Sequence, residues 1–541
     1  MTQLGGSRNC RVARHPLKIP VIAFPVTPDP SENFGGNQVQ STDLAMPTFR
    51  ATTHATPSTA RRPFKVRLVA INPEGFSSAL AFLAATVDQQ FQGMATVEQL
   101  IYDSEDVRNR GFDVSLAISD IVKDGPDIIG LSWYSWNDAL VRHIAKLVTE
   151  LLPDAALIVG GPQTRTAFEP DLMTLPAGTV LVFGEGEQTF CQLIDAVLAE
   201  DTLSRLPEGS GLVTGEGIRR GKPRTQAIPL QSLPSPILTG HFHEPNGRRL
   251  PSYSTTRGCV FRCSFCAWHD NLNERLFPLD KVLAELDVIA GKNYEMVWFT
   301  DTIFGRDVER GLAILKHLEG WGGRTKFGFE MHAQFLDPAL VEGIARLPID
   351  FAAIGVQSLA PGVLRLSKRS PKTQKLHDAI DLLYRRMPDR GTVHIDLIFG
   401  MPEQTLDDCL QSVSELLEKY PDATLFCSML QLIPGTAFER YRQEPGWVCL
   451  SPEGDYEVVS TPTLQGDDLL RLRDLLVGLD AMWIARRDDD AGLRLSAEQA
   501  ETVGKALRGS RFHNCPTAYR QGLMTWKDVE AAGQEVIRSY S

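Results

Sequence analysis

Three cysteines with a C-x3-C-x2-C spacing are the residues of this chain whose chemistry is easiest to infer. Cys259, Cys263 and Cys266 follow a short β-prone run, residues 252–256, and precede a helical stretch. Thiolates are soft ligands that favour iron–sulfur clusters or zinc over hard cations. Because three thiolates leave one iron of a cluster without a protein ligand, a cluster held here would bind a substrate or cofactor at that iron as well as carry electrons.

Two other interpretations of the cysteines stay open at this point. A structural zinc ion would take Cys259, Cys263, Cys266 and His269, since closed four-ligand sites are usual for structural zinc. Alternatively, the cysteines are inert and packed as small apolar residues. The spacing favours the cluster, because structural zinc usually draws on two separated pairs of ligands and the chain has no second C-x2-C.

The cysteine motif, with the aromatic residue Phe265 just before its last cysteine, resembles that of the radical S-adenosylmethionine (SAM) enzymes. The resemblance implies that Cys259, Cys263 and Cys266 hold a [4Fe–4S] cluster and that SAM chelates the fourth iron. It further implies that the reduced cluster cleaves SAM to a 5′-deoxyadenosyl radical, which is chemistry that a cofactor carries. Phe265 is then expected to lie against the adenine, which Leu432 or Ile433 would flank.

Four polar residues downstream are candidates for the SAM site. Glu330, Gln357 and Asp396 lie in or just after apolar strands, and Arg369 follows Gln357 by twelve residues. Acidic and amide groups are rarely buried without a partner, and a zwitterionic, ribose-bearing ligand would partner all four. By resemblance to the coproporphyrinogen-oxidase-like and BchE-like branches of the family, Gln357 and Asp396 are expected to contact the SAM ribose. Glu330 would take the amino group and Arg369 the carboxylate, whereas salt bridges between neighbouring strands are the alternative.

The residues that must position these side chains are patterned as alternating strands and helices. Expected strands cover 296–300, 327–331, 351–356, 394–398 and 425–432, and expected helices include 279–290, 307–319 and 406–419. The alternation predicts a partial (β/α)6 barrel over residues 249–450, with its working residues at the C-terminal ends of the strands. Asp301 ends one such strand and would orient SAM or substrate, or cap the following helix.

An upstream module has the same alternation. Strands are expected over 66–71, 113–118, 127–132, 156–160 and 180–183, with helices from Ser78 and over 138–152 and 188–198. The pattern predicts an α/β, doubly wound, Rossmann-like parallel sheet over residues 63–205. Such sheets bind ligands at the carboxyl ends of their strands, where the glycine turns of this module lie.

Three strand-end motifs of this module together resemble the cobalamin-binding domain that precedes many radical SAM cores. They contain Ser132-Trp133-Tyr134, Gly160-Gly161-Pro162 and Gly184-Glu185-Gly186. None of the eleven histidines fits the D-x-H-x-x-G pattern of domains that place histidine on cobalt. The resemblance therefore implies histidine-independent binding of cobalamin. Trp133, Tyr134 and Trp136 are expected to pack against the corrin or into the core.

The remaining segments and the composition complete the prediction. Residues 1–62 are expected to be a low-complexity extension, residues 206–248 a linker, and residues 451–541 a small, mostly helical C-terminal domain in which His513 and Cys515 stay open as substrate contacts. The net charge of −12 argues against a nucleic-acid partner, and no apolar run reaches the length of a membrane span. Nine cysteines, of which three are clustered, are typical of a reducing compartment and predict a cytoplasmic protein.

The two resemblances imply a cobalamin-dependent radical SAM methyltransferase that acts on an unactivated carbon of a natural product or peptide. One SAM would methylate the reduced corrin, and a second would yield the radical that removes a substrate hydrogen before the methyl group is transferred. An external electron donor such as flavodoxin or ferredoxin is implied. Two other functions stay open: a BchE-like oxidative cyclase or ring-rearranging enzyme, and a non-catalytic corrinoid- or redox-sensing protein. The polar set at Glu330 argues against a sensor, which has no use for a SAM site.

Overall fold

The structure is a computed structural model, and its described residues all belong to one compact unit within residues 47–541. They cover 62–72, 75–103, 113–168, 175–199, 201, 203–245, 249–268, 273–450, 456–489 and 493–508. The extension predicted over 1–62 (apart from Arg62), His269, His513 and Cys515 lie outside the described residues.

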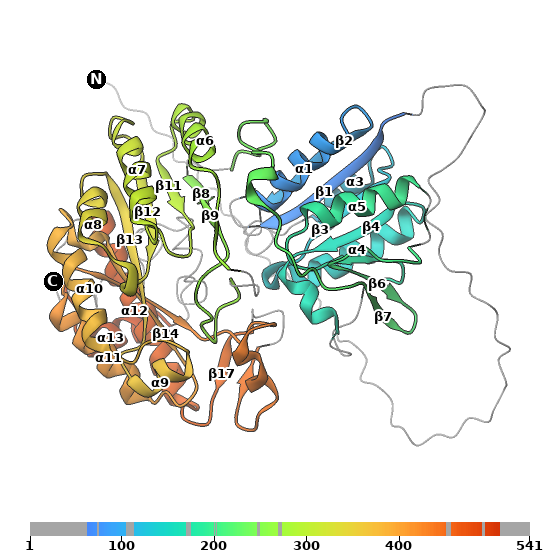
Figure 1. Ribbon diagram of the computed structural model, residues 1–541. Coiled ribbons are helices and arrows are strands. Elements are labelled where there is room, and N and C mark those ends of the chain that lie inside the picture. The colour runs from blue at the N-terminus through green and yellow to red at the C-terminus, as the bar shows by residue number, and fades with distance from the viewer. Residues whose placement is uncertain are drawn as a thin grey trace, which may run out of the picture. The chain divides into compact units, whose positions relative to one another are not determined.

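The first module is a seven-stranded sheet, drawn from blue to green in Figure 1. In spatial order its strands are β2 (Ala95–Asp103), β1 (Phe64–Asn72), β3 (Ile128–Ser132), β4 (Ala156–Gly160), β5 (Val180–Val182), β6 (Ser210–Thr214) and β7 (Gly217–Arg220). The first five are parallel, and β6 and β7 are antiparallel. Nearly continuous apolar runs such as β1 and β3 are typical of strands that are buried on both faces.

Helices cover both faces of this sheet, so the module is doubly wound as predicted. Helices α1 (Ser78–Gln90) and α5 (Glu187–Leu198) pack against one face and share a core with Leu68 and Ile158. Helices α3 (Val114–Val122) and α4 (Asp138–Leu151) share a second core with Ile129 and Val159 on the other face. The side chains of neighbouring residues in one strand thus enter different cores, as the two-residue period of a strand requires.

The structure differs from the sequence prediction at three places in this module. The strand predicted over 113–118 is wrong: the residues form α3, whose apolar positions follow a helical period and whose N-cap, Asp113, accepts a hydrogen bond from Leu116 N at 3.0 Å. The edge strand β2 was not predicted, because its half-exposed sequence mixes polar and apolar residues. Part of the segment assigned to a linker, 206–248, forms the β6–β7 hairpin, which extends the sheet beyond β5.

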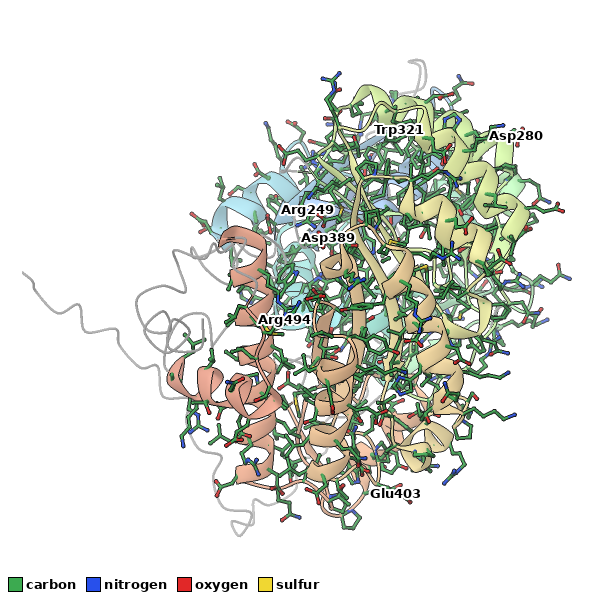
Figure 2. The ribbon with its side chains drawn as sticks, turned by 90° about the vertical axis from the view of Figure 1, so that its left-hand side faces the viewer. Arg249, Asp280, Trp321, Asp389, Glu403 and Arg494 are labelled. Atoms are coloured by element: carbon green, nitrogen blue, oxygen red, sulfur yellow. The ribbon has the colours of Figure 1, made fainter. Side chains whose placement is uncertain are left out.

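The second module is a six-stranded, all-parallel sheet with edges at β15 and β8, so it is an open, partial barrel as predicted. In chain order its strands are β8 (Arg249–Tyr253), β11 (Met296–Phe299), β12 (Lys326–Met331), β13 (Ile349–Gln357), β14 (Val393–Phe399) and β15 (Thr424–Met429). The helices between them are α6 (Leu279–Gly291), α7 (Val308–Glu319), α8 (Pro338–Ala345), α9 (Pro361–Leu366), α10 (Thr373–Arg386) and α11 (Leu406–Lys419). Figure 2 shows Trp321, which precedes β12, and Glu403, which follows β14, toward opposite ends of this module.

The described part of the C-terminal region is mostly helical, apart from a short strand, β17 (Val458–Ser460), and completes the core of the barrel. Helices α12 (Asp467–Asp489) and α13 (Ala497–Ala506) bury residues such as Leu475 and Val503 in the same cluster as the barrel strands. An added Cβ at Gly478 or Gly504 would overlap backbone atoms of the other helix, so these glycines allow the two helices to approach closely. Among the described residues, none of the helices combines the length and the apolar composition that crossing a bilayer requires.

Candidate active site

The cysteine loop starts from a two-residue strand, β9 (Thr256–Arg257), which pairs with β10 (Arg275–Leu276). Asp301, buried at the end of β11, holds this start. Its carboxylate accepts hydrogen bonds from the backbone N–H groups of Thr255 (2.6 Å) and Thr256 (2.9 Å), and from both threonine hydroxyls (2.7 and 3.1 Å). Burial raises the pKa of Asp301, and these hydrogen bonds lower it. Asp301 therefore positions the loop; the cap of the following helix α7 is Asp307 and not Asp301, and an orienting role toward SAM or substrate stays a prediction.

All three cysteines of the loop are free thiols. Backbone N–H groups point at two of the sulfurs, from Phe261 to Cys259 Sγ at 3.4 Å and from Trp268 to Cys266 Sγ at 3.5 Å. Donors of this kind stabilise a thiolate over a thiol. Burial raises the pKa of Cys266 to about 11, so this sulfur needs a bound metal to stay deprotonated near neutral pH.

The donor set of the loop fits an iron–sulfur cluster. Among the described residues no three His, Cys, Asp or Glu side chains converge on one point, and His269, the fourth ligand of the zinc alternative, lies outside them. A [4Fe–4S] cluster places each cysteine on a different iron, so its ligands need not converge on one point. Three cysteine thiols on one loop, two of them facing backbone donors, are the ligands such a cluster takes.

Three of the four residues predicted for SAM lie on neighbouring strands of the barrel, and the fourth, Arg369, lies between α9 and α10. Glu330 is on β12, Gln357 ends β13 and Asp396 is on β14, beside Gly355 in the register. Arg369 joins this set to the cysteine loop: its Nη2 donates to the Gly355 carbonyl at 2.5 Å and its Nη1 to Cys263 Sγ at 3.6 Å. A Cβ added at Gly355 would lie 2.6 Å from Gln357 Nε2, so the absence of a side chain there makes room for the amide.

The charge on Glu330 depends on what binds beside it. Burial, and next the nearby Asp396 carboxylate, raise the pKa of Glu330 to about 8. Two carboxyl groups that repel each other in a half-buried site do not both ionise readily. A cationic group placed between them would favour ionisation of both. The pair is therefore suited to a ligand that carries an ammonium group.

Apolar contacts and one additional residue complete this side of the site. Phe265 packs against the apolar cluster that contains Leu432, which agrees with the expected neighbourhood of the two residues. His332, just after β12, was not predicted as a site residue. Its ring stacks on Phe261 of the cysteine loop with centroids 4.2 Å apart, and burial together with Arg369 lowers its pKa to about 3. His332 is thus a neutral ring at neutral pH, and its position after a strand end was the signal that could have found it.

A cavity of about 680 Å³ lies between the strand ends of the two modules. Its walls include Ser132, Tyr134, Gly160, Gly161, Pro162, Gly184, Glu185 and Gly186 from the first module, and Thr256, Arg257, Gly258, Trp268, Thr302 and Ile433 from the second. Every residue predicted for cobalamin except Trp133 therefore lines one cavity, and this cavity reaches the cysteine loop.

Trp133 does not belong to this wall. Its side chain is fully buried, and its indole Nε1 donates to Asp138 Oδ1 at 2.7 Å. The Arg142 guanidinium lies over the ring, 5.0 Å from its centroid. The expectation that it contacts a corrin is therefore replaced by a core position. Tyr134 and Trp136 do line the cavity, and their rings stack with centroids 4.3 Å apart.

The cavity fits a large, flat ligand with a polar rim. Gly161 has a φ of +113°, and a Cβ there would overlap the carbonyl oxygen of Trp133, so the turn is open to only the smallest residue. The Ser132 hydroxyl is buried and has no partner within the protein. An unpartnered buried hydroxyl is costly, so a ligand or water in the cavity is expected to bond to it. These features match what the amide-rimmed, planar corrin of cobalamin needs.

Comparisons with known proteins agree with this geometry. The sequence model of the radical SAM superfamily matches residues 253–416, and that of the B12-binding domain matches residues 66–194. The chain therefore carries a B12-binding domain followed by a radical SAM domain. The two domains and the fold class predicted from the sequence are thereby confirmed.

Relatives of this B12-binding radical SAM protein include two methyltransferases. The chain is 27% identical over 381 residues to the cobalamin-dependent radical SAM methyltransferase TokK of Streptomyces tokunonensis, and 25% identical over 392 residues to 2-(S-pantetheinyl)-carbapenam-3-carboxylate methyltransferase of Streptantibioticus cattleyicolor. Each match covers 66% of this chain and 54% of the relative. The chain thus spans about half the length of these curated relatives.

Two solved structures share the fold. The methyltransferase TsrM of Kitasatospora setae, determined with cobalamin and a [4Fe–4S] cluster bound, has a TM-score of 0.59 at 17% identity, over 88% of this chain and 99% of that one. OxsB, determined with aqua-cobalamin and SAM bound, has a TM-score of 0.62 at 16% identity, over 88% of this chain and 79% of that one. Both likenesses concern the whole two-module arrangement of strands and helices.

Proposed function

We propose that this protein is a cobalamin-dependent radical SAM methyltransferase that methylates an unactivated carbon of a natural product or peptide. The observation that carries the proposal is the shared cavity, which the glycine turns of the first module and the cysteine loop of the second both line. A methyl donor held at one wall and a radical initiator held at the other would meet a substrate between them. Holding reacting groups in this way can supply a large part of a catalytic rate enhancement.

The residues of the chain have distinct tasks in this proposal. Cys259, Cys263 and Cys266 hold the cluster, which together with SAM supplies a hydrogen-abstracting radical when both are bound. Arg369 binds the SAM carboxylate through a charged hydrogen bond, while Glu330 takes its amino group. Loss of the proton from Glu330 accompanies that contact, because the pKa of its carboxyl lies near 8 without a ligand.

In the same proposal, the first module binds cobalamin through a surface of glycine turns and aromatic rings that is complementary to the corrin. The turns at Gly160, Gly161 and Gly184 let the backbone approach the corrin, and Tyr134 and Trp136 lie against it. The described lining of the cavity contains no histidine, which supports histidine-independent binding. We also propose a flavodoxin or ferredoxin as electron donor, in a reducing, cytoplasmic setting.

The relatives favour methylation over cyclisation. The match to TokK covers 66% of the chain at 27% identity, whereas a match to an anaerobic magnesium-protoporphyrin IX monomethyl ester cyclase of Rubrivivax gelatinosus covers 55% at 21% identity. The TsrM structure with tryptophan bound and the carbapenam methyltransferase suggest the first compounds to test, a tryptophan-containing peptide and a pantetheinylated carbapenam.

The test is an anaerobic assay of the reconstituted protein with cobalamin, SAM, a strong reductant and these two compounds. We expect the mass of an accepted compound to increase by one CH2 with two SAM consumed, alongside 5′-deoxyadenosine. A product with no added CH2 would indicate the cyclase function. If neither 5′-deoxyadenosine nor methylated corrin forms while the cluster is intact, the protein is a binding or sensing protein.

A further inference from the structure

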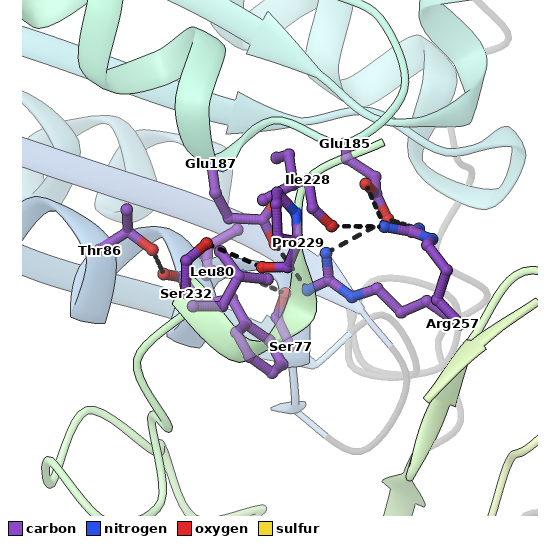
Figure 3. A network of polar contacts seen from close by, with 12 residues as sticks. Ser77, Leu80, Thr86, Glu185, Glu187, Ile228, Pro229, Ser232 and Arg257 are labelled. Carbon is purple, nitrogen blue, oxygen red and sulfur yellow. Dashed lines mark hydrogen bonds and ion pairs between the residues drawn. The ribbon is translucent and has the colours of Figure 1, made fainter. Parts of the chain in front are cut away.

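Two arginines of the second module and two glutamates of the first form a compact ionic network beside the cavity (Figure 3). Arg257 Nη2 lies 2.6 Å from Glu187 Oε1, and Arg257 Nη1 lies 3.5 Å from Glu185 Oε1. Arg275 Nη1 donates to Glu185 Oε2 at 3.1 Å, and its Nη2 donates to the other oxygen of that carboxylate. Glu185 therefore bonds to both arginines, and the four residues act as one group.

The two short strands β9 and β10 need these glutamates to offset the charge of their own arginines. In the antiparallel pair β9–β10, Arg257 lies directly opposite Arg275. Like charges directly opposite each other destabilise a strand pair. Two carboxylates from the turn that follows β5 neutralise this pair, so the residues 256–257 and 275–276 depend on the first module for a stable arrangement.

The network is largely removed from water. The side chain of Glu187 is 6% exposed and that of Arg257 is 19% exposed. The Arg257 guanidinium lies over the rings of Phe82 and Phe277, at 4.7 and 5.7 Å from their centroids. Removing one member of a buried ion pair leaves an uncompensated charge, unlike removal of a member of an exposed pair. Replacing any one of the four side chains should therefore disturb the arrangement of the other three.

We propose that Arg257, Arg275, Glu185 and Glu187 form a clasp that fixes the glycine turn after β5 against the start of the cysteine loop. Arg257 is two residues before Cys259, and Glu185 lies between Gly184 and Gly186 of the turn. The clasp residues are positioning residues: they set the separation of the two cavity walls. Because a misplacement of about 1 Å can cost about 100-fold in rate, such a separation matters for transfer between the walls. This inference rests on the proposed function.

The clasp is tested with holoprotein that carries cluster and cobalamin. In Arg257→Gln we expect iron and corrin per chain to equal the wild type and 5′-deoxyadenosine release from SAM to stay within about twofold. Methyl transfer from SAM to the reduced corrin should fall about tenfold or more, in line with the cost of misplacement. Pulsed electron paramagnetic resonance should show a longer or broader distance between cobalt(II) and the reduced cluster.

Two further variants and one control distinguish loss of the clasp from a general loss of folding. Glu187→Gln keeps the size of the side chain and should reproduce the effect if Arg257→Gln does not fold. The double exchange Arg257→Glu with Glu187→Arg should recover at least part of the lost methyl transfer and narrow the distance distribution. Arg346→Gln breaks an exposed pair with Glu319, whose N–O distance is 2.6 Å, and should change neither readout.

The outcomes separate the clasp from the proposed function. A wild-type distance and a wild-type transfer rate in both Arg257→Gln and Glu187→Gln would overturn the clasp, as would loss of iron or corrin together with the rate. If the wild type itself transfers no methyl group, the proposed function fails, whereas the cobalt–cluster distance still decides whether the clasp positions the two walls.

Discussion

The two walls of the cavity are built in different ways. The barrel wall contains residues that flank the cysteines, such as Gly258 and Trp268, and the barrel side of the site has side chains with charge or ligand chemistry: three thiols, a guanidinium 3.6 Å from one of them, and two half-buried carboxyl groups. The wall from the first module presents glycine turns, a stacked aromatic pair and one unpartnered hydroxyl. The first wall binds by specific side chains and the second by the shape of its backbone. Single side-chain deletions should therefore damage the barrel wall most, and added atoms should damage the other.

The largest effect is expected for Cys263→Ala in the barrel wall. Loss of one of three protein ligands should abolish the cluster, because no other described thiol adjoins the loop. Iron content and the visible absorbance of the cluster should be lost, together with all 5′-deoxyadenosine formation. The control is Cys191→Ala, a thiol in the core of the first module that should leave iron content unchanged. A Cys263→Ala protein that still cleaves SAM would refute the ligand assignment.

The matching change in the first module adds one carbon to a turn. In Gly161→Ala the new Cβ would overlap the Trp133 carbonyl oxygen at a φ of +113°, which costs about 1–3 kcal/mol for the backbone alone. We expect corrin affinity to fall by about tenfold or more and iron content to stay at the wild-type level, as measured by absorbance titration. Gly215→Ala, where a Cβ meets nothing within 4 Å, is the control. Equal corrin affinity in both variants would contradict a backbone-shaped wall.

A smaller loss is expected for Arg369→Ala. Charged hydrogen bonds contribute about 1.5–3 kcal/mol, so the affinity for SAM should fall about 10- to 100-fold, measured by calorimetric titration. Iron content should not change, although the reduction potential of the cluster should shift because a cation beside Cys263 is lost. Unaltered SAM affinity would mean that this arginine serves another purpose.

The next prediction concerns the carboxyl groups of Glu330 and Asp396, and it is tested by the pH dependence of SAM binding. Glu330 has a raised pKa of about 8, so the ligand-free protein loses stability as the pH rises from about 4.5 to 8. A SAM ammonium needs the ionised carboxylate, so affinity should rise by up to about tenfold per pH unit below pH 8. Above pH 8, SAM loses its own α-amino proton, and its affinity for the protein falls again. Calorimetry with an uncleavable SAM analogue should give a maximum near pH 8, and Glu330→Gln should lose the acidic limb. An acidic limb that persists in Glu330→Gln would assign it to another group.

The smallest effect concerns the tryptophan that lies in the core. Trp133→Phe removes the hydrogen bond to Asp138, which contributes about 1 kcal/mol and corresponds to a loss of about 2–4 °C in Tm. Corrin affinity should be unchanged, because Trp133 does not line the cavity. Trp136→Leu should do the reverse, with lower corrin affinity and little change in Tm. A loss of corrin binding in Trp133→Phe would place this ring at the ligand after all.

The same contrast explains how much could be predicted from the sequence. The barrel site could be proposed residue by residue, because thiols at a fixed spacing and polar residues after apolar strands seldom have a purely structural role; the roles assigned to these residues stay predictions. The contact of Asp301 with the cysteine loop was not predicted. Its partners include backbone N–H groups, which every residue except proline has, so the sequence does not single them out. His332 was missed as well, because only the fold brings it against Phe261.

In the first module, local sequence was a weaker guide. Residues 113–118 were predicted as a strand because they are apolar, yet the helical period and the Asp113 cap determine a helix. The edge strand β2 pairs along one side only, so it lacks the apolar run that marks β1 and β3. The aromatic residues Trp133, Tyr134 and Trp136 are close in sequence, yet Trp133 lies in the core while the other two stack in the cavity, which depends on the turn after β3. The clasp of Arg257 and Glu187 joins residues 70 positions apart and is invisible to local patterns.

The central claim is that both walls carry a cofactor at once, and its most direct test is a count. Protein reconstituted anaerobically with iron, sulfide and cobalamin should be analysed for iron, sulfide, zinc and corrin per chain. We predict about four irons and four sulfides, as a single [4Fe–4S] cluster requires, together with one corrin. A chain that instead holds one zinc ion, with neither sulfide nor corrin, would contradict the account.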